Sequence, residues 1–382
     1  MKVIHVCNVP IPPDHPDVSR LQFHPGRWVL NLAIAQKAHT GIEPQLLVQV
    51  PGASRDHVCE IEGIPAHFVA APDRFRSATL FYFDSRRMAA RVHALRPDVV
   101  HAHGTEDCYA LAAQRSGLPY TITVQGLFFL INRILRPRAF SRERAVEFTE
   151  HRCLRRARHV IAKSDYVADA LRAQFPHLTL HRIPNTIDAR LAGIRGEKEP
   201  GVLAFVGVIS HRKGLDLLID AIAETQRDFP DVRLWIFGDN PAAPSAYETQ
   251  MRTRLTALMG GRVVFHGTVS GFEVACQVAR ATALVAPSRE EMFGNQLVEA
   301  LAVGTHAIVT DQTAMAENVR RFGSGTIVPQ EDAAALARAI SALLQSPPAS
   351  AAAAKSRAGI FADFGPAAVA AAHRQLYEKL LT

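Results

Sequence analysis

The stretch ALVAPSREEMFGNQLVEALAV, residues 283–303, joins an apolar run to a helix-like pattern through a short polar loop. The run that ends before Pro287 has no polar interruption, which is typical of a strand buried on both faces of a parallel sheet. From Gly294 onward, apolar residues recur at helical spacing. A buried strand, a loop and a helix in this order form the repeating unit of a doubly wound α/β fold.

The same alternation extends over the whole chain. In the first half we predict strands at Lys2–Cys7, Gln45–Val50, Ala66–Val69, Asp98–Ala102, Tyr120–Val124, His159–Ala162 and Leu180–Ile183. In the second half we predict them at Val202–Val206, Arg233–Phe237, Arg262–His266, Thr282–Val285, His306–Val309 and Gly325–Val328. Helical patterns fill most of the gaps, so we expect two doubly wound domains.

The alternation lapses at Asp188–Gly201, where Gly, Pro and charged residues follow one another without a period, and this predicts an interdomain linker. A chain of 382 residues is long enough for two cores. We assign residues 1–190 to a first domain and 191–364 to a second. A last helix, expected near Pro366–Leu381, leads us to place residues 365–382 back on the first domain. Ligands of such sheets bind beyond the carboxyl ends of the strands, so we expect the site in a cleft between the domains.

Composition narrows the class of protein. Apolar residues make up 48% of the chain and its net charge is +7, which excludes a disordered or low-complexity protein. The longest apolar runs, such as Val202–Ile209, are far shorter than a bilayer span, so no transmembrane helix is expected. The five cysteines show no CxxC spacing, and the N-terminus has no signal-peptide pattern. We expect a cytoplasmic protein without disulfides or structural zinc.

A basic region follows the apolar cluster Leu127–Ile131. Nine arginines lie between Asn132 and Arg158. One interpretation is an exposed basic helix over an ordinary core contact. The other is a surface that meets a membrane or an acidic acceptor. Elsewhere the basic residues do not form a stripe with interleaved aromatic residues, so no nucleic-acid partner is expected.

Two carboxylates flank the start of the helix that Gly294 opens. Glu291 lies in the loop, and Glu299 lies two turns into the helix. The first N–H groups of a helix have no partner within it, which makes this turn an anion site. A diphosphate bound there would have one carboxylate on either side. The alternative is a solvated helix with an acidic N-terminus.

A basic pair forms the second candidate element. Arg212 and Lys213 stand in the segment FVGVISHRKG, residues 205–214, after the first predicted strand of the second domain. Cations held at a strand–helix turn are natural partners of phosphate oxygens. The alternative is a lysine solvated in a loop.

Together these segments resemble the retaining GT-B glycosyltransferases of family 4. The span from Glu291 to Glu299 resembles the Glu-x7-Glu donor motif of the family, and Val206–Gly214 resembles its Gly-Arg-Leu…Lys-Gly turn. Arg182–Asp188 is similar to the Pro-Asn-Gly-x-Asp element that ends the first domain. Asp98–Gly104 and Val160–Ser164 are similar to two of its strands. The segments arrive in the order of the family and span most of the chain.

The resemblance implies a GT-B fold, in which two Rossmann-like domains face an interdomain cleft. It implies transfer of a sugar, with retention, from a nucleoside-diphosphate sugar to a saccharide, lipid-linked or small-molecule hydroxyl acceptor. Surface polysaccharide or glycolipid synthesis is the expected setting. No cofactor is expected, and no metal, because fixed positive charge stabilises the departing nucleoside diphosphate. A cytoplasmic enzyme with peripheral contact at the inner membrane face is expected.

The resemblance also implies roles for residues. Glu299 would hold the ribose hydroxyls, and Glu291 those of the transferred sugar. The remaining donor-binding positions are Lys213 with Arg212 and the amides near Phe293, Gly294, Asn295 and Gln296 at the diphosphate, the loop His266, Gly267, Thr268 and Val269 at the base, and the turn His24, Pro25, Gly26 and Arg27 over the phosphates. Glu291, Lys213 and His103, which would line the cleft, are the expected catalytic residues.

Four positions depart from the family pattern. Val208 stands where an arginine commonly accompanies the motif lysine, and Arg212 is the candidate substitute. Gln125 occupies a position often held by histidine near the transferred sugar. Only Gly26 remains of two usual glycines; for Arg27, which follows it, the alternative to phosphate binding is a solvated helix start. Thr186 replaces a hinge glycine.

Several alternatives stay open. His101 and His103 share one face of a strand, so they are a candidate metal pair, a buried structural pair, or cleft-lining residues. Asp239 is either a loop cap or part of the nucleotide pocket. For the whole chain, the alternatives are a catalytically silent sugar-nucleotide-binding scaffold and a sugar-nucleotide epimerase of the same architecture.

Overall fold

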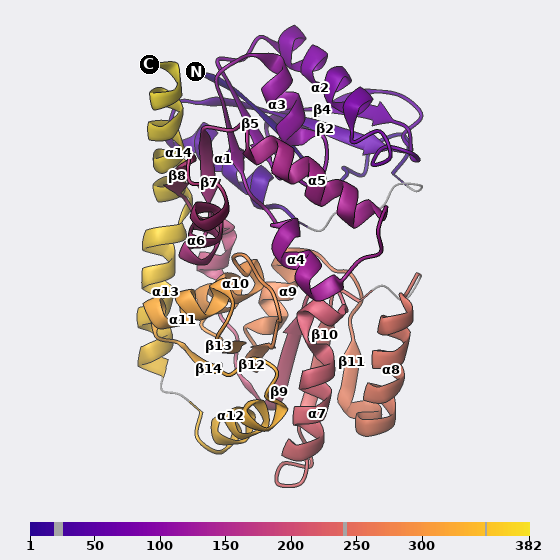
Figure 1. Cartoon of the computed structure of the whole chain (residues 1–382). Coiled ribbons are helices and arrows are strands. Elements are labelled where there is room, and N and C mark those ends of the chain that lie inside the picture. Colours follow the sequence, from indigo (N-terminus) through magenta and orange to yellow (C-terminus); the bar gives the residue numbers. More distant parts are fainter. Residues whose placement is uncertain (19–25, 240–242, 348–349) are drawn as a thin grey trace. The chain divides into compact units, whose positions relative to one another are not determined.

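The computed structural model describes residues 1–18, 26–239, 243–347 and 350–382. The chain divides into two compact units (Figure 1). Unit 1 comprises Met1–Thr186 and Phe364–Thr382, and unit 2 comprises Ile187–Asp363. Sequence analysis placed the first boundary at residue 190 and began the last segment at residue 365.

Unit 1 is built on an eight-stranded sheet of order β3-β4-β2-β1-β5-β6-β7-β8. The strands are β1 (Lys2–Cys7), β2 (Glu43–Pro51), β3 (His57–Ile61), β4 (Ile64–Ala71), β5 (Val99–His103), β6 (Tyr120–Thr123), β7 (His159–Ala162) and β8 (Thr179–Arg182). All neighbours pair in parallel except β3, which is antiparallel to β4. The helices are α1 (Trp28–His39), α2 (Tyr82–Leu95), α3 (Tyr109–Ser116), α4 (Phe128–Leu135), α5 (Arg142–Leu154), α6 (Asp165–Gln174) and α14 (Pro366–Leu381).

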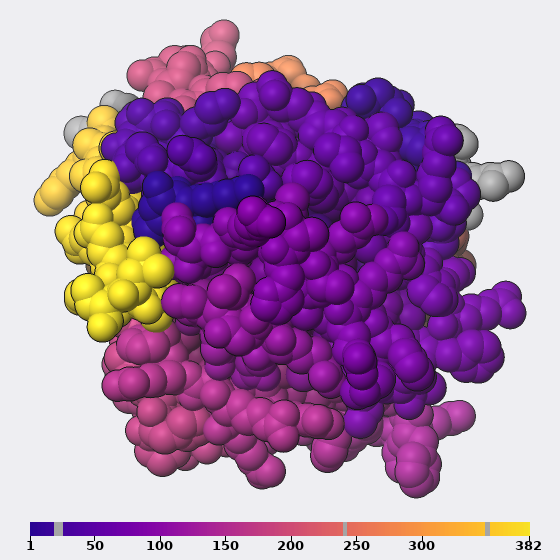
Figure 2. Space-filling view, turned by 90° about the horizontal axis from the view of Figure 1, so that it is seen from above, coloured from indigo at the N-terminus to yellow at the C-terminus, as the bar shows by residue number. Residues whose placement is uncertain are grey.

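Helix α14, the last of the chain, completes unit 1 by packing on α1. Leu376 and Val369 of α14 are buried against Leu32 of α1. Tyr377, the residue after Leu376, is buried in a second cluster with Val3 of β1 and Val99 of β5. Figure 2 accordingly shows the yellow C-terminal segment beside the indigo N-terminal residues.

Unit 2 is built on a six-stranded parallel sheet of order β11-β10-β9-β12-β13-β14. The strands are β9 (Glu199–Val206), β10 (Arg233–Phe237), β11 (Val263–Phe265), β12 (Ala281–Ala286), β13 (His306–Thr310) and β14 (Gly325–Val328). The α-helices are α7 (Leu215–Thr225), α8 (Ala246–Met259), α9 (Gly271–Val278), α10 (Asn295–Ala302), α11 (Ala314–Phe322), α12 (Ala333–Gln345) and α13 (Ser350–Phe364), with 3-10 turns η1 (Ala189–Gly193), η2 (His211–Lys213) and η3 (Gly260–Arg262).

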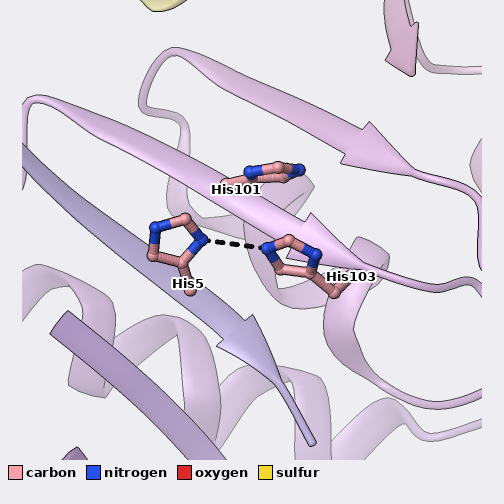
Figure 3. Close-up of side chains that lie close together, drawn as sticks. All are labelled: His5, His101 and His103. Carbon is pink, nitrogen blue, oxygen red and sulfur yellow. Dashed lines mark hydrogen bonds between the residues drawn. The ribbon is translucent and has the colours of Figure 1, made fainter. Parts of the chain in front are cut away.

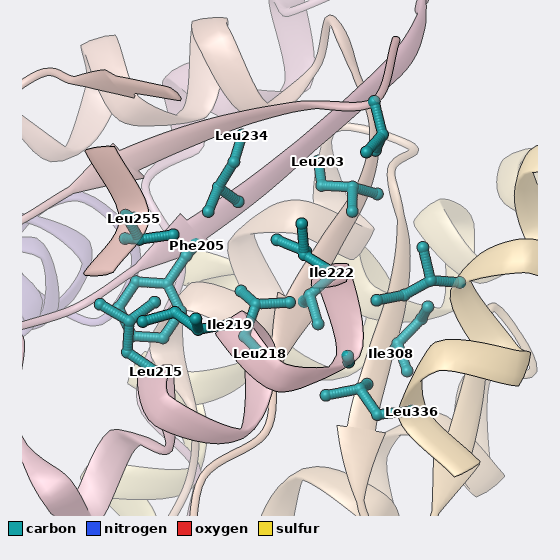
Figure 4. Close-up of a cluster of buried hydrophobic side chains, with 14 of the residues drawn as sticks. Leu203, Phe205, Leu215, Leu218, Ile219, Ile222, Leu234, Leu255, Ile308 and Leu336 are labelled. Atoms are coloured by element: carbon teal, nitrogen blue, oxygen red, sulfur yellow. The ribbon is translucent and has the colours of Figure 1, made fainter. Parts of the chain in front are cut away.

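The core of unit 2 lies between its sheet and the helices on one face. Figure 4 shows Leu203 and Phe205 of β9 facing Leu218 and Ile222 of α7, with Leu336 of α12 beside them. All five side chains are essentially inaccessible to water. Burial of this apolar surface fixes α7 against the sheet, and with α7 the turn that precedes it.

The strand order places one particular loop pair at the centre of unit 2. The chain runs from β9 outward to β10 and β11 on one side, and from β12 outward to β13 and β14 on the other. The order therefore reverses between β9 and β12, and ligands of doubly wound sheets bind at such a switch point. The loops after β9 and β12 carry Lys213 and Glu291. In unit 1 the corresponding reversal lies between β1 and β5, which ends at His103.

Three elements were not predicted. Strand β3 alternates between partly buried and exposed residues at the sheet edge, so it lacks the continuous apolar run of its neighbours. Helix α4 was seen only as an apolar cluster. Helix α13, Ser350–Phe364, was not predicted either, although it agrees with the high helix propensity of its alanines. No helix among the described residues is long and apolar enough to cross a membrane.

We expect Leu376→Ala to destabilise unit 1 by about 2–5 kcal/mol, because it leaves a cavity where α14 packs on α1. Leu381→Ala, at the exposed end of the same helix, is the matched control. Denaturant unfolding measures both. Equal unfolding midpoints for the two variants would contradict the packing described here.

Candidate functional site

The loops after β9 and β12 contact each other through a glycine. Gly214, the N-cap of α7, has φ of 71°, and a Cβ built on it would lie 2.0 Å from the carbonyl oxygen of Pro287. Both the backbone conformation and the contact exclude any side chain here. The backbone N–H of Arg289 donates to the carbonyl of Arg212 at 2.8 Å, which links the two loops a second time.

This contact brings the predicted basic and acidic residues together. Lys213 Nζ lies 2.5 Å from Glu291 Oε2, and Arg212 Nη1 lies 3.7 Å from the same oxygen. Gln296 Nε2 donates to it at 3.4 Å. Arg212 Nη1 also donates to the Glu290 carbonyl at 2.7 Å. Arg212 and Lys213 therefore form one cationic group in front of the acidic loop.

The electrostatics of the pair follow from its burial. Burial would raise the pKa of the Glu291 carboxyl, but the nearby Lys213 and Arg212 cations and hydrogen bonds from Lys213 and Gln296 lower that pKa to about 2. Burial lowers the pKa of Lys213, an effect that Glu291 opposes. The Glu291 carboxylate is therefore fully ionised at neutral pH, and its negative charge favours the charged form of the lysine beside it.

Arg289 holds this arrangement in place, a role that sequence analysis did not identify. Its guanidinium forms two hydrogen bonds of 2.8 Å with Asp216 at the start of α7 and a 2.5 Å contact with Glu331. It also donates to the carbonyl of His211 at 2.6 Å. Arg289 thus connects the β12 loop to both ends of the turn that carries Lys213. The only signal in the sequence was its position within the acidic segment.

The start of α10, where the sequence predicts an anion site, follows a tightly packed glycine. Gly294 has φ of 80°, and an added Cβ would lie 2.5 Å from Met315 Cγ. Asn318 Nδ2 donates to the carbonyl of the buried Phe293 at 3.3 Å, which fixes the approach to the helix. Helix α10 begins at Asn295, and Gln296 is its second residue.

Glu299 lies on α10 and differs from Glu291 in charge state. Burial, together with the nearby Asp188 carboxylate, raises the pKa of Glu299 to about 8. Glu299 is therefore largely protonated at neutral pH in the ligand-free protein, whereas Glu291 is ionised. The two carboxyls of the motif thus have opposite protonation states.

The loop expected at the base follows β11, two strands from β9. The N–H of Gly267 donates to Asp239 Oδ1 at 2.8 Å, and Thr268 Oγ1 donates to the Asp239 carbonyl at 3.4 Å. Asp239 is also paired with Arg252. Of its two interpretations, the structure favours the loop cap. Val269 follows in the same loop.

The remaining predicted residues lie in unit 1. The ring of Trp28 occupies the space beside Gly26, so a side chain at residue 26 would require that ring to move. Arg27 forms an ion pair with Glu62 at 2.6 Å, and contact with a phosphate would require it to leave that pair. His24 and Pro25 of the same turn lie outside the described residues. His103 ends β5 and is buried.

Three polar residues of unit 1 had no role in the sequence analysis: Lys163 and Glu106, which follow strands β7 and β5, and Glu150 of α5. Lys163, directly after β7, donates to Gln125 Oε1 at 2.8 Å. Glu106, after β5, has a pKa raised to about 7 by burial. Glu150 accepts a hydrogen bond from Thr105 at 2.8 Å and likewise has a pKa raised to about 7 by burial. Glu106 and Lys163 could have been found because each stands just beyond a predicted strand, as Gln125 does. Glu150, within a helix, had no such signal.

Two groups of side chains in the described part of the chain are close enough together to hold a metal, and both lie in unit 1. One is His5, His101 and His103. The other is Asp14, His57 and Cys59, around strand β3. Neither group includes a residue of the two loops at the centre of unit 2.

Two family models match the sequence. The model described as Glycosyltransferase Family 4 covers residues 25–191, and that described as Glycosyl transferases group 1 covers residues 200–346. Between them they cover both units.

Curated relatives agree with these models. A glycogen synthase of Mycobacterium tuberculosis is 30% identical over 291 residues, which is 74% of this chain and 69% of the relative. The lipopolysaccharide core biosynthesis mannosyltransferase LpcC of Rhizobium leguminosarum is 29% identical over 202 residues, 51% of this chain and 56% of LpcC. The match to LpcC therefore spans little more than half of that enzyme.

Solved structures share the architecture. Sucrose-phosphate synthase from Thermosynechococcus elongatus has a TM-score of 0.81 at 21% identity, over 99% of this chain and 98% of that one. Anabaena HepE in complex with UDP and glucose has a TM-score of 0.74 at 18% identity, over 100% and 99% of the two chains. These likenesses and the two parallel sheets define the GT-B class. Within that class, the chain belongs to glycosyltransferase family 4.

The raised pKa of Glu299 predicts how stability depends on pH. The carboxyl is protonated in the folded chain up to about pH 8, whereas it ionises above about pH 4.3 in the unfolded chain. Its ionisation on unfolding makes the folded state progressively less stable as pH rises from about 5 to 8. Glu299→Gln removes this loss, so we expect its melting temperature to exceed that of the wild type increasingly over that range.

The exposed Glu224→Gln is the matched control, and its melting temperature is expected to follow the wild type. Glu106 and Glu150 are unchanged in both variants and cancel in the comparison. A constant difference between Glu299→Gln and the wild type at all pH values would contradict the shifted pKa.

Proposed function

We propose that this chain transfers a sugar, with retention, from a nucleoside-diphosphate sugar to a hydroxyl acceptor, without a metal ion. The observation that carries the proposal lies within unit 2. Lys213 and Arg212 face the acidic loop at 2.5 and 3.7 Å from Glu291, beside the glycine-opened start of α10. Fixed cations and helix N–H groups at one point are what a diphosphate requires.

In the proposed reaction the bond between the anomeric carbon and the β-phosphate oxygen breaks, and its electron pair leaves with the nucleoside diphosphate. Lys213, Arg212 and the N–H groups of Gly294 and Gln296 stabilise the charge that develops there. The acceptor oxygen bonds to the same face of the sugar, and its proton passes to the departing phosphate. One preorganised donor of this kind contributes about 2.7–4 kcal/mol to transition-state stabilisation.

The two carboxyls take different parts in this proposal. Glu291, ionised and held by Lys213, accepts hydrogen bonds from hydroxyls of the transferred sugar. Glu299, on α10 and with its pKa raised to about 8, holds the ribose hydroxyls. A protonated carboxyl both donates and accepts hydrogen bonds, which suits a pair of vicinal hydroxyls.

Relatives support the choice of substrates. Anabaena HepE has been solved with UDP-glucose, and a trehalose-6-phosphate enzyme from E. coli with UDP-2-fluoro glucose. LpcC acts in lipopolysaccharide core biosynthesis, and a Mycobacterium leprae relative, 35% identical over 136 residues, is a phosphatidyl-myo-inositol mannosyltransferase. We therefore propose a hexose donor and an acceptor of surface polysaccharide or glycolipid synthesis.

Lys213→Met keeps the packing of the lysine stem but removes its charge. We expect turnover to fall by at least tenfold, and by about 10²–10³ if Lys213 acts as a full phosphate donor. Transfer and hydrolysis are measured with a panel of UDP-, GDP- and ADP-sugars, with and without excess EDTA. EDTA is expected to leave the rate unchanged.

The exposed Lys355→Met in unit 2 is the control and should retain wild-type turnover with an unchanged melting temperature. Binding of sugar nucleotide without any turnover would favour the silent scaffold instead. An epimerised donor without transfer would indicate the epimerase. Wild-type kinetics in Lys213→Met would refute the phosphate assignment.

We further propose that the basic region of unit 1 makes peripheral contact with the cytoplasmic face of the inner membrane. Phe140, between α4 and α5, is fully exposed, and Phe148 of α5 is 58% exposed. Leu135 at the end of α4 is 44% exposed. Exposed apolar side chains among the arginines of residues 132–158 combine the two features that attach a protein to an anionic lipid surface.

We expect the protein to co-sediment with vesicles of phosphatidylcholine and phosphatidylglycerol at low salt, and less so at high salt. Replacing both Phe140 and Phe148 with Ser should weaken this binding. Phe83→Ser, an exposed phenylalanine of α2, is the control and should not weaken it. Absence of sedimentation at low salt, or equal loss in the control, would end this proposal.

A further inference from the structure

A continuous chain of buried hydrogen bonds lies beneath His103. It links His5 of β1, Gln36 of α1, His101 and His103 of β5, and Tyr377 of α14, and we call these five residues the α14 network. All five are at most 4% exposed. Figure 3 shows His5 reaching across to His103, with the ring of His101 beside them. The rings of His101 and His103 lie 3.9 Å apart.

The first branch runs from the amide oxygen of Gln36. This oxygen can only accept, so the His5 Nε2 that lies 2.8 Å from it carries the proton. A neutral imidazole with its proton on Nε2 has its lone pair on Nδ1. His5 Nδ1 lies 2.9 Å from His103 Nε2, so His103 donates there and carries its own proton on Nε2.

The second branch runs from the amide nitrogen of Gln36. This nitrogen donates to the Tyr377 hydroxyl at 3.0 Å. The hydroxyl in turn donates to His101 Nδ1 at 2.7 Å, and His101 Nε2 donates to Thr123 Oγ1 at 2.7 Å. One amide orientation therefore sets the proton positions of both branches, because reversal of the amide would reverse every bond in the chain.

The network has no charged histidine. Burial lowers the pKa of His5 to about 3 and holds those of His101 and His103 well below their usual range. His373 of α14, beside them, has a pKa lowered to about 4 by burial, and Lys163 further disfavours a charge on His103. Both nitrogens of His5 and of His101 are engaged in hydrogen bonds, so the structure disfavours the metal-pair interpretation.

His103 Nδ1 has no hydrogen-bond partner among the described residues. His103 lines a narrow pocket of unit 1 with Trp28, Thr123, Asn185 and His373. With its proton on Nε2, His103 presents a lone pair on Nδ1, and it is a hydrogen-bond acceptor there.

We propose that Gln36, His5 and Tyr377 are positioning residues that hold His103 in its Nε2–H tautomer, so that His103 Nδ1 accepts a hydrogen bond from a sugar hydroxyl of the substrate. The assignment of His103 to the substrate site rests on the proposed function. The proposal makes His103 a neutral hydroxyl acceptor and not a proton donor. It also gives α14, at the end of the chain, a part in substrate binding.

The tautomers are read directly from the ligand-free, full-length protein labelled with ¹⁵N-histidine, by long-range ¹H–¹⁵N correlation spectra. We expect His5, His101 and His103 to be neutral Nε2–H tautomers from pH 5.5 to 8. A cationic His103 at pH 7, or one with its proton on Nδ1, would overturn the proposal. This readout does not depend on catalysis, so it separates a failure of this proposal from a failure of the proposed function.

Two variants test whether Gln36 and Tyr377 determine the tautomer of His103. Gln36→Met removes the amide at nearly constant volume, and Tyr377→Phe removes the partner that orients it. Tyr377 acts on His103 only through Gln36 and His5, and we expect both variants to give His103 a mixture of tautomers. Tyr120→Phe removes a hydroxyl of unit 1 outside the network and should leave the His103 signals unchanged. The His159–His181 pair, at 3.0 Å, is an internal reference in each spectrum.

Kinetics supply the second readout. If half of His103 adopts the wrong tautomer, the KM for the sugar substrate should rise about twofold while kcat changes less. A His103 tautomer unchanged in both Gln36→Met and Tyr377→Phe overturns the proposal. An altered tautomer with an unchanged KM overturns the role in substrate binding. If Gln36→Met fails to fold, the spectra of Tyr377→Phe and of the wild type still test the proposed tautomer of His103.

Discussion

The close approach of Gly214 to the Pro287 carbonyl is the constraint on which the arrangement of unit 2 depends. A side chain at residue 214 would force the loop after β9 away from the loop after β12. The two loops could then not place Lys213 2.5 Å from Glu291. The contact occurs where the strand order reverses, because only there do two neighbouring parallel strands send their chains to opposite sides. Sheet topology and one glycine together therefore determine where the charges meet.

The charged side chains of the two loops compensate one another. Glu291 compensates Lys213 and Arg212 in the ligand-free protein, which limits the cost of burying the lysine. Arg289 has separate partners, Asp216 and Glu331, and is not available to a ligand. Arg289 thus holds the two loops together, whereas Lys213 and Arg212 direct their charge at the predicted site. A phosphate arriving there would replace part of the compensation that Glu291 now provides.

The regular elements of the fold followed from local patterns. The bounds predicted for Lys2–Cys7, His159–Ala162 and Arg233–Phe237 equal those of β1, β7 and β10, because uninterrupted apolar runs identify strands buried on both faces. Edge strand β3 lacked that signal because half of it faces solvent. The partners of Arg289 and of Gln36 could not be predicted either. Gln36 and Tyr377 are 341 positions apart, and no local period records which buried polar groups satisfy one another.

The position of α14 in unit 1 has a consequence for the order in which the two units fold during synthesis. Its residues leave the ribosome only after all of unit 2 has been synthesised, yet they cover α1 and supply Tyr377 to the interior of unit 1. The first sheet therefore cannot acquire its complete buried hydrogen bonding before unit 2 has been synthesised. Unit 2, which is continuous in sequence, has no such requirement. During synthesis, unit 2 is thus expected to complete its folding before unit 1 does.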